Sequence, residues 1–123
     1  MQAIRGAITV TQNNEKEIRE ATHCLIGEIL KKNQLKPEDL VSVIFSLTDD
    51  LNASNPAKHF REMGMTDTPL FCVQEAKING ALKKCIRVII HINTMDKDLF
   101  HIYLRDAKKM RPDISGGENG NET

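Results

Sequence analysis

The chain has 123 residues, which is enough for one domain with a modest hydrophobic core. Lysine and arginine together number 17, as do aspartate and glutamate, so a net charge of zero gives no general attraction for nucleic acid or an anionic membrane. Three cysteines without a CxxC spacing argue against a disulfide or zinc framework and indicate free thiols in a reducing cytoplasm.

Neither a membrane anchor nor a secretion signal is expected. No apolar run in the sequence approaches the about 20 residues that a membrane-spanning helix needs. The first residues, MQAIRGAITV, lack the charged start, the long apolar run and the cleavage site of a signal peptide. We therefore expect a cytoplasmic protein.

The amino-terminal part of the chain predicts a strand followed by a long helix. Apolar and polar residues alternate over residues 3–11, which places Arg5 on the less apolar face of that strand. Gly6 within the strand indicates a close backbone approach or a bulge. Asn14 is a good helix cap, and an apolar stripe at helical spacing carries the helix to about Lys32.

A second strand and a short helix are predicted next. Residues 41–48 alternate in polarity and are expected to face the core through Val41, Val43, Phe45 and Leu47. The following loop contains two adjacent aspartates without a third ligand, so we interpret it as solvated rather than metal-binding. On a helix over residues 57–63, Lys58 and Arg61 are three residues apart and share one face. They either bind one anion together or are two exposed cations.

The segment CVQEAKINGALKKCIRVIIHI, residues 72–92, has the pattern of a hairpin in which a glycine-containing turn joins two strands. Arg87 lies in the middle of the second strand, on its mixed face, and needs an anionic partner or water there. Glu75 is the last residue before the turn. The hairpin therefore brings two opposite charges together, as either an ion pair or two walls of a polar pocket.

The carboxy-terminal part predicts a fifth strand over residues 99–107, with Tyr103 on its more polar side, and a mobile polar tail from residue 115. The order of the elements predicts an α+β fold in which one long helix covers one face of a small mixed five-strand sheet. Because several strands carry apolar residues on both faces, we expect the uncovered face to pack on other copies in a homo-oligomer.

The candidate site residues lie on strand faces and on the short helix. They suggest a pocket for a small polyanion, formed by Arg5, Lys58, Arg61, Arg87, Arg111, Glu75, Tyr103 and Cys72. The sequence shows no Ser–His or Cys–His arrangement, no obvious carboxylate partner for any histidine, no metal cluster and no cofactor motif. A catalytic pocket of this kind would act by holding and polarising its substrate.

Four segments, IRGAITV, NPAKHFRE, CVQEAKINGALKKCIRV and HIYLRDAKKMRPD, resemble the AroH-class chorismate mutases, and the resemblance covers residues 2–114. It implies one catalytic domain over residues 1–114 with a flexible tail over 115–123. It also implies a homotrimeric pseudo-α/β barrel with its active sites between subunits. The implied reaction is the Claisen rearrangement of chorismate to prephenate, in phenylalanine and tyrosine biosynthesis, without cofactor, general base or covalent intermediate.

The resemblance assigns a role to each candidate residue. Arg87 would stabilise negative charge on the ether oxygen as the C–O bond breaks. Glu75 would accept a hydrogen bond from the ring hydroxyl and face the positive part of the transition state. Cys72 would contribute chiefly its backbone beside that hydroxyl. The remaining residues would bind a substrate carboxylate or ring the mouth of the cleft, with the two on the short helix coming from a neighbouring subunit: Arg5, Tyr103, Lys58, Arg61 and Arg111.

Three positions depart from the members familiar to us. Asn55 and Phe71 stand where those members carry Phe and Thr, and Met110 stands where they carry Leu. Asn55 would lie at the edge of the pocket and Phe71 would add bulk beside Cys72, so we expect activity to be kept and affinity to differ. Two other functions are alternatives. One is a trimeric hydrolase of imines or enamines, which shares the architecture and which a hydrolysis assay would reveal. The other is a non-enzymatic trimer that senses a small anion without turning it over and regulates a partner.

Overall fold

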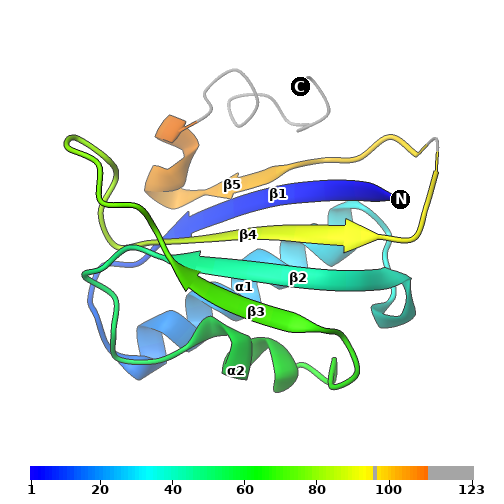
Figure 1. The fold of residues 1–123 in the computed structure, drawn as a ribbon, viewed down its shortest axis with the longest axis horizontal. Coiled ribbons are helices and arrows are strands. Elements are labelled where there is room, and N and C mark those ends of the chain that lie inside the picture. Colours follow the sequence, from blue (N-terminus) through cyan, green and yellow to red (C-terminus); the bar gives the residue numbers. More distant parts are fainter. Residues whose placement is uncertain (96, 111–123) are drawn as a thin grey trace.

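The structure is a computed structural model and describes residues 1–95 and 97–110. Within these residues the chain forms one mixed sheet in the order β3-β2-β4-β1-β5 (Figure 1), from β1 (Gln2–Thr9), β2 (Leu40–Leu47), β3 (Leu70–Gln74), β4 (Cys85–Ile92) and β5 (Ile102–Leu104). β4 runs antiparallel to both β1 and β2, whereas β3 is parallel to β2 and β5 is parallel to β1. The helical segments are α1 (Glu15–Lys32), α2 (Pro56–Arg61) and the 3₁₀ turns η1 (Pro37–Asp39) and η2 (Arg105–Met110). The predicted α+β architecture is confirmed.

α1 begins and ends where the sequence predicts. The side chain of Asn14 accepts a hydrogen bond from the backbone nitrogen of Glu17 at 2.8 Å, which satisfies one of the free donors of the first turn. Lys31 and Lys32 lie in the last turn, where the helix dipole favours positive charge. The buried stripe of α1 packs on one face of the sheet (Figure 1), through Ile18, Ala21, Leu25, Ile26 and Ile29.

Gly6 in β1 is the point of close approach between α1 and the sheet. A Cβ atom added there would lie 2.9 Å from Cδ1 of Ile29 and 3.2 Å from Cδ1 of Leu25. Such distances are shorter than ordinary van der Waals contact, so a side chain at this position would force the ends of Ile29 and Leu25 to move and would crowd the backbone oxygen of Ile102 at 3.1 Å. The interpretation of Gly6 as a close approach is confirmed.

The predicted hairpin of residues 72–92 is wrong, because β2 lies between its two strands. β3 pairs with β2, which it reaches through α2 as a parallel β-α-β crossover, and β4 pairs with the other edge of β2. The alternating pattern correctly predicts both strands, but alternation says only which face a residue occupies and not which strand lies next to it.

Two local predictions also fail. A register irregularity between Leu40 and Ser42 turns Leu40 into the core and leaves Val41 38% exposed, although Val41 was expected to face the core. The fifth strand is limited to β5, because Arg105 adopts a positive φ of 56° and the chain continues as η2. The tail from residue 115 lies outside the described residues.

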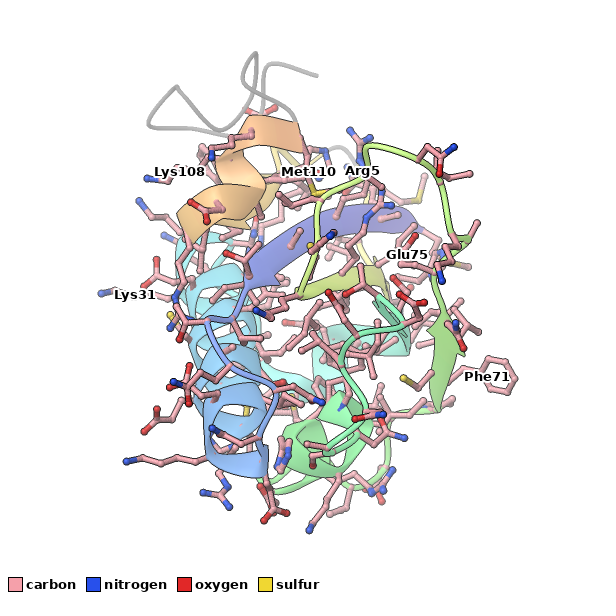
Figure 2. The ribbon with its side chains drawn as sticks, turned by 90° about the vertical axis from the view of Figure 1, so that its left-hand side faces the viewer. Arg5, Lys31, Phe71, Glu75, Lys108 and Met110 are labelled. Atoms are coloured by element: carbon pink, nitrogen blue, oxygen red, sulfur yellow. The ribbon has the colours of Figure 1, made fainter. Side chains whose placement is uncertain are left out.

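The face of the sheet opposite α1 carries exposed apolar side chains. Ile44, Phe71 and Val73 are 36%, 66% and 40% exposed, and the strand register places all three on this face. Figure 2 shows Phe71 and Glu75 on the side of the sheet away from Lys31 of α1. We call this face, centred on Ile44, Phe71 and Val73, the open face.

Candidate active site

The register of the sheet places Arg87 in the middle of a row of four strands. Arg87 of β4 pairs with Ser46 of β2 on one side and with Ala7 of β1 on the other, and Ala7 in turn pairs with Tyr103 of β5. Paired residues share one face of a sheet, so all four belong to the open face. Because the two direct neighbours of Arg87 are small, the row leaves a hollow around its guanidinium.

That hollow is a cavity of about 290 Å³ on the open face. Its lining brings together four of the residues that the sequence singles out, and it consists of Arg5, Gly6, Ile44, Ser46, Glu75, Arg87, Val88, Ile89 and Tyr103. The lining combines apolar side chains with charges of both signs. The arrangement suits a small anionic molecule with an apolar body.

Arg87 and Glu75 form an ion pair inside this cavity. Nη1 of Arg87 lies 3.3 Å from both carboxylate oxygens of Glu75, and the two side chains are 46% and 22% exposed. The hydroxyl of Ser46 donates to the same carboxylate, and the backbone nitrogen of Glu75 donates to the carbonyl of Leu47 at 2.7 Å. The two alternatives drawn from the sequence therefore both hold: the charges are paired, and they line a pocket.

Tyr103 and Arg5 are each fixed by contacts with residues outside the cavity. Tyr103 is 6% exposed and belongs to a small second core with Ala7, Cys85 and Ala107, against which Leu82 and Met110 also pack. The backbone nitrogen of Arg5 donates to Nδ1 of His101 at 2.9 Å. These contacts fix one end of the cavity, next to η2.

Cys72 and Phe71 lie on opposite faces of β3. Phe71 pairs with Ile44 on the open face, whereas Cys72 pairs with Phe45 and packs against the main core. Burial raises the pKa of the Cys72 thiol. The thiol therefore points away from the cavity that holds Arg87, and the added bulk of Phe71 faces out of the sheet.

The cations of the short helix do not line the cavity of their own chain. Nζ of Lys58 lies 3.0 Å from Oε2 of Glu15 on α1, and the hydrogen bond from Lys58 lowers the pKa of that carboxyl. Arg61 is exposed on the same helix. Asn55 caps α2 by accepting a hydrogen bond from the backbone nitrogen of Ala57 at 2.9 Å, and it too is absent from the cavity lining. Arg111 lies outside the described residues.

One sequence-based statement about histidines is wrong. Nε2 of His59 lies 2.7 Å from Oγ of Ser54, and Nδ1 of the same ring lies 3.0 Å from Oε1 of Glu62. A Ser–His pair and a carboxylate partner therefore do exist. The spacing of three residues between His59 and Glu62 on a helix was the signal that could have revealed the second contact.

Comparison with known proteins gives a consistent result. The family model described as chorismate mutase type I matches residues 1–114. The chain is 41% identical over 122 residues to Chorismate mutase AroH of Bacillus subtilis, covering 97% of this chain and 96% of that protein. It is 36% identical over 121 residues to Chorismate mutase AroH of Thermus thermophilus, covering 96% and 99%.

The chain belongs to the chorismate mutase type I family. Among solved structures, a chorismate mutase from Clostridium thermocellum superposes with a TM-score of 0.85 at 46% sequence identity, covering 89% of this chain and 99% of that one. The chain is accordingly an isomerase that converts chorismate to prephenate, a reaction of aromatic amino-acid biosynthesis. The resemblance seen in the sequence is confirmed, and the imine hydrolase and the anion sensor are set aside.

Two further findings concern the described part of this chorismate mutase. No group of three or more His, Cys, Asp or Glu side chains within residues 1–95 and 97–110 is arranged to hold a metal ion. No helix of the same residues is long and apolar enough to cross a membrane.

The thiols of this chorismate mutase are expected to differ in reactivity. Cys24 is exposed, whereas Cys85 is fully buried and its burial raises its pKa to about 11. Because the thiolate is the reactive form, iodoacetamide at about pH 8 should label Cys24 first and leave Cys85 unlabelled until the protein unfolds. Peptide mass mapping of a labelling time course checks this order. Equal labelling rates for the two thiols in the native protein would contradict it.

Proposed function

We propose that the cavity lined by Arg87, Glu75, Arg5 and Tyr103 is where chorismate is bound and rearranged. The observation that carries the proposal is the Arg87–Glu75 pair: two opposite charges face one small cavity that also contains a second arginine and a phenol. Chorismate is a dianion with an apolar ring, so it matches a lining of cations and aliphatic side chains.

In the proposed mechanism the chain holds the substrate in its reactive shape and stabilises the charges that develop. One C–O bond breaks while one C–C bond forms within the same molecule, so no proton, electron or group enters or leaves. The Arg87 guanidinium would face the ether oxygen as it becomes negative, a contribution of about 3–4 kcal/mol by analogy with oxyanion-hole donors. Glu75 would accept a hydrogen bond from the ring hydroxyl and face the positive fragment of the transition state. Arg5 and Tyr103 would bind a carboxylate of the substrate.

The Arg87–Glu75 ion pair supports this mechanism because it is preorganised but weak. A partly exposed pair of this kind contributes about 0–1 kcal/mol to stability, so the substrate can share the guanidinium at little energetic cost. The hydroxyl of Ser46 keeps the Glu75 carboxylate in place when that happens. Both charges are then already oriented when the transition state forms.

We further propose that the active unit is a homotrimer, a pseudo-α/β barrel, in which a neighbouring subunit completes each site. The open face exposes Ile44, Phe71 and Val73, which suits burial against another copy. Lys58 and Arg61 lie outside the cavity lining of their own chain, which is consistent with a place at the cavity of a neighbour. Arg111, in the segment outside the described residues, would ring the same entrance, with Cys72, Phe71 and Asn55 at its edges.

Mixing two impaired variants, assayed at a chorismate concentration well below KM, tests the sharing of a site between subunits. Arg87→Ala and Lys58→Ala subunits, refolded together, should regain part of the wild-type activity, because some interfaces then combine an intact Arg87 with an intact Lys58. Light scattering should give a mass of three chains before and after mixing. If the two residues served the same subunit's cavity, the mixture would be no more active than its components.

The primary assay follows the loss of chorismate absorbance in the ultraviolet with product identification as prephenate. Conversion well above the spontaneous rate supports the proposed site when Arg87 and Glu75 variants lose it. We also propose that residues 1–114 form one catalytic domain and that the enzyme acts in the cytoplasm, where its three free thiols would stay reduced. The tail over residues 115–123 lies outside the described residues.

Glu15 is expected to weaken substrate binding by competing for Lys58. Its carboxylate lies 3.0 Å from the Lys58 ammonium, where a substrate carboxylate of the neighbouring cavity would bind. Replacing Glu15 with glutamine should lower KM about two- to threefold and leave kcat unchanged, because an exposed pair of this kind is weak. Glu20→Gln, on the same helix, removes an equal charge and should leave KM unchanged. Equal effects of the two variants would point to net charge alone.

A further inference from the structure

The Ser54–His59–Glu62 cluster joins the two ends of α2. Ser54 precedes the helix, Glu62 follows it, and His59 lies inside it with its ring fully buried. One imidazole contacts both, at 2.7 Å from Oγ of Ser54 and 3.0 Å from Oε1 of Glu62. The hydrogen bond with His59 lowers the pKa of Glu62, so the carboxylate that holds the ring stays ionised at neutral pH.

α2 is also tied to α1 through the same residue. Nε2 of His23 lies 3.0 Å from the backbone oxygen of His59, and the two imidazoles meet edge to face at 6.3 Å. Next to His59, Phe60 is fully buried and packs edge to face on Phe45 of β2. A helix of six residues has little stability of its own, so the orientation of α2 depends on such contacts.

The opposite side of α2 carries the two cations of the proposed cleft. His59 and Phe60 are buried, whereas Lys58 and Arg61 on either side of them are exposed. A rotation of α2 that moved the His59 ring would therefore move both cations as well. The reach of a cation into a neighbouring cavity is sensitive to displacements of about 1 Å, which can change rates up to about 10²-fold.

A nucleophilic role for Ser54 fits the cluster poorly. A serine nucleophile needs a histidine that can pass its proton to a leaving group, and the His59 ring is 0% exposed. The supporting Glu62 carboxylate is 38% exposed, the reverse of the usual order in which the carboxylate is the buried member. The geometry of the cluster fits a role in fixing α2 better than a direct contact with substrate.

We propose that His59 is a positioning residue for the mutase reaction: by bridging Ser54 and Glu62 it sets the orientation of α2, and with it Lys58 and Arg61, toward the substrate of the neighbouring subunit. The inference rests on the proposed function, in which these cations act in a shared cleft. Ser54 and Glu62 contribute to the same positioning role through their contacts with the His59 ring.

The test compares KM with kcat in variants of the cluster. His59→Leu fills the buried site with an apolar side chain and removes both polar contacts, and we expect KM to rise about tenfold with kcat within about twofold of wild type. Ser54→Ala and Glu62→Ala remove one contact each from partly exposed positions and should raise KM about threefold. These two variants keep the test decisive if His59→Leu fails to fold.

Thr22→Val is the matched control for simple loss of stability. Thr22 is fully buried in α1, where its hydroxyl donates to the Ile18 carbonyl at 2.8 Å, so the variant also loses a buried hydrogen bond. It should lower the melting temperature without raising KM. A rise in KM that merely follows the fall in melting temperature across Thr22→Val and the cluster variants would overturn the proposal.

A double-mutant cycle separates this inference from the proposed function. If His59 acts through Lys58, then His59→Leu should add little to the KM of Lys58→Ala, whereas independent effects would multiply. An unchanged KM in Lys58→Ala overturns the assumed role of that lysine and the inference with it. A raised KM in Lys58→Ala with normal KM in all three cluster variants overturns the inference alone.

Discussion

Replacing Arg87 with alanine should lower kcat by at least about 10²–10³-fold, the range seen when one preorganised oxyanion donor is removed. The guanidinium lies in a cavity of about 290 Å³ and is already oriented by Glu75 at 3.3 Å. Arg5, the other cation of the described lining, is assigned to a substrate carboxylate in the proposed mechanism, so the ether oxygen would lose its stabilising charge. KM should change far less, because Arg5 and the cations of α2 still attract the dianion.

Arg87→Ala is expected to fold normally, because the Arg87 side chain is partly exposed. The side chain is 46% exposed and its ion pair is weak, so the melting temperature and the light-scattering mass should match wild type. Arg87→Lys is the matched comparison: it keeps the charge but loses the planar donor set, and it should recover only part of the lost kcat. An Arg87→Ala enzyme with near-normal kcat would remove Arg87 from the proposed mechanism.

The sequence predicts the elements around Arg87 better than their arrangement. Alternation correctly places Arg87 and Arg5 on a face distinct from the core, and the cap at Asn14 correctly starts α1. It does not reveal that β2 separates β3 from β4, because strand neighbours are set by long-range packing rather than local pattern. Glu75 still reaches Arg87, since it extends past the end of β3 and lies beside Ser46.

The residues of α2 show a second limit of sequence reasoning. Lys58 and Arg61 were recognised as a shared face, but their separation from the Arg87 cavity within one chain depends on the fold. The role of His59 was missed because Ser54 lies on the loop before the helix, and loop geometry carries no periodic signal. Asn55 is explained locally: an asparagine caps α2, which a phenylalanine at the same position cannot do.

Replacing Glu75 with glutamine is the second change expected to have a large effect, a fall in kcat of about 10²-fold. Glutamine can still accept a hydrogen bond from the ring hydroxyl, but it no longer offers negative charge to the positive fragment of the transition state. KM should stay level or fall slightly, because the substrate no longer competes with Glu75 for the Arg87 guanidinium. Steady-state kinetics with chorismate gives both constants.

Two companion variants separate the charge of Glu75 from its hydrogen bonds. Glu75→Ala removes both and should be slower still, and Ser46→Ala removes only the hydroxyl that donates to the carboxylate, so it should lose less than about tenfold in kcat. If Glu75→Gln retained full kcat while Glu75→Ala lost it, the hydrogen bond rather than the charge would matter. If both retained it, Glu75 would serve only as the resting partner of Arg87, and catalysis would rest on the cations of the cleft.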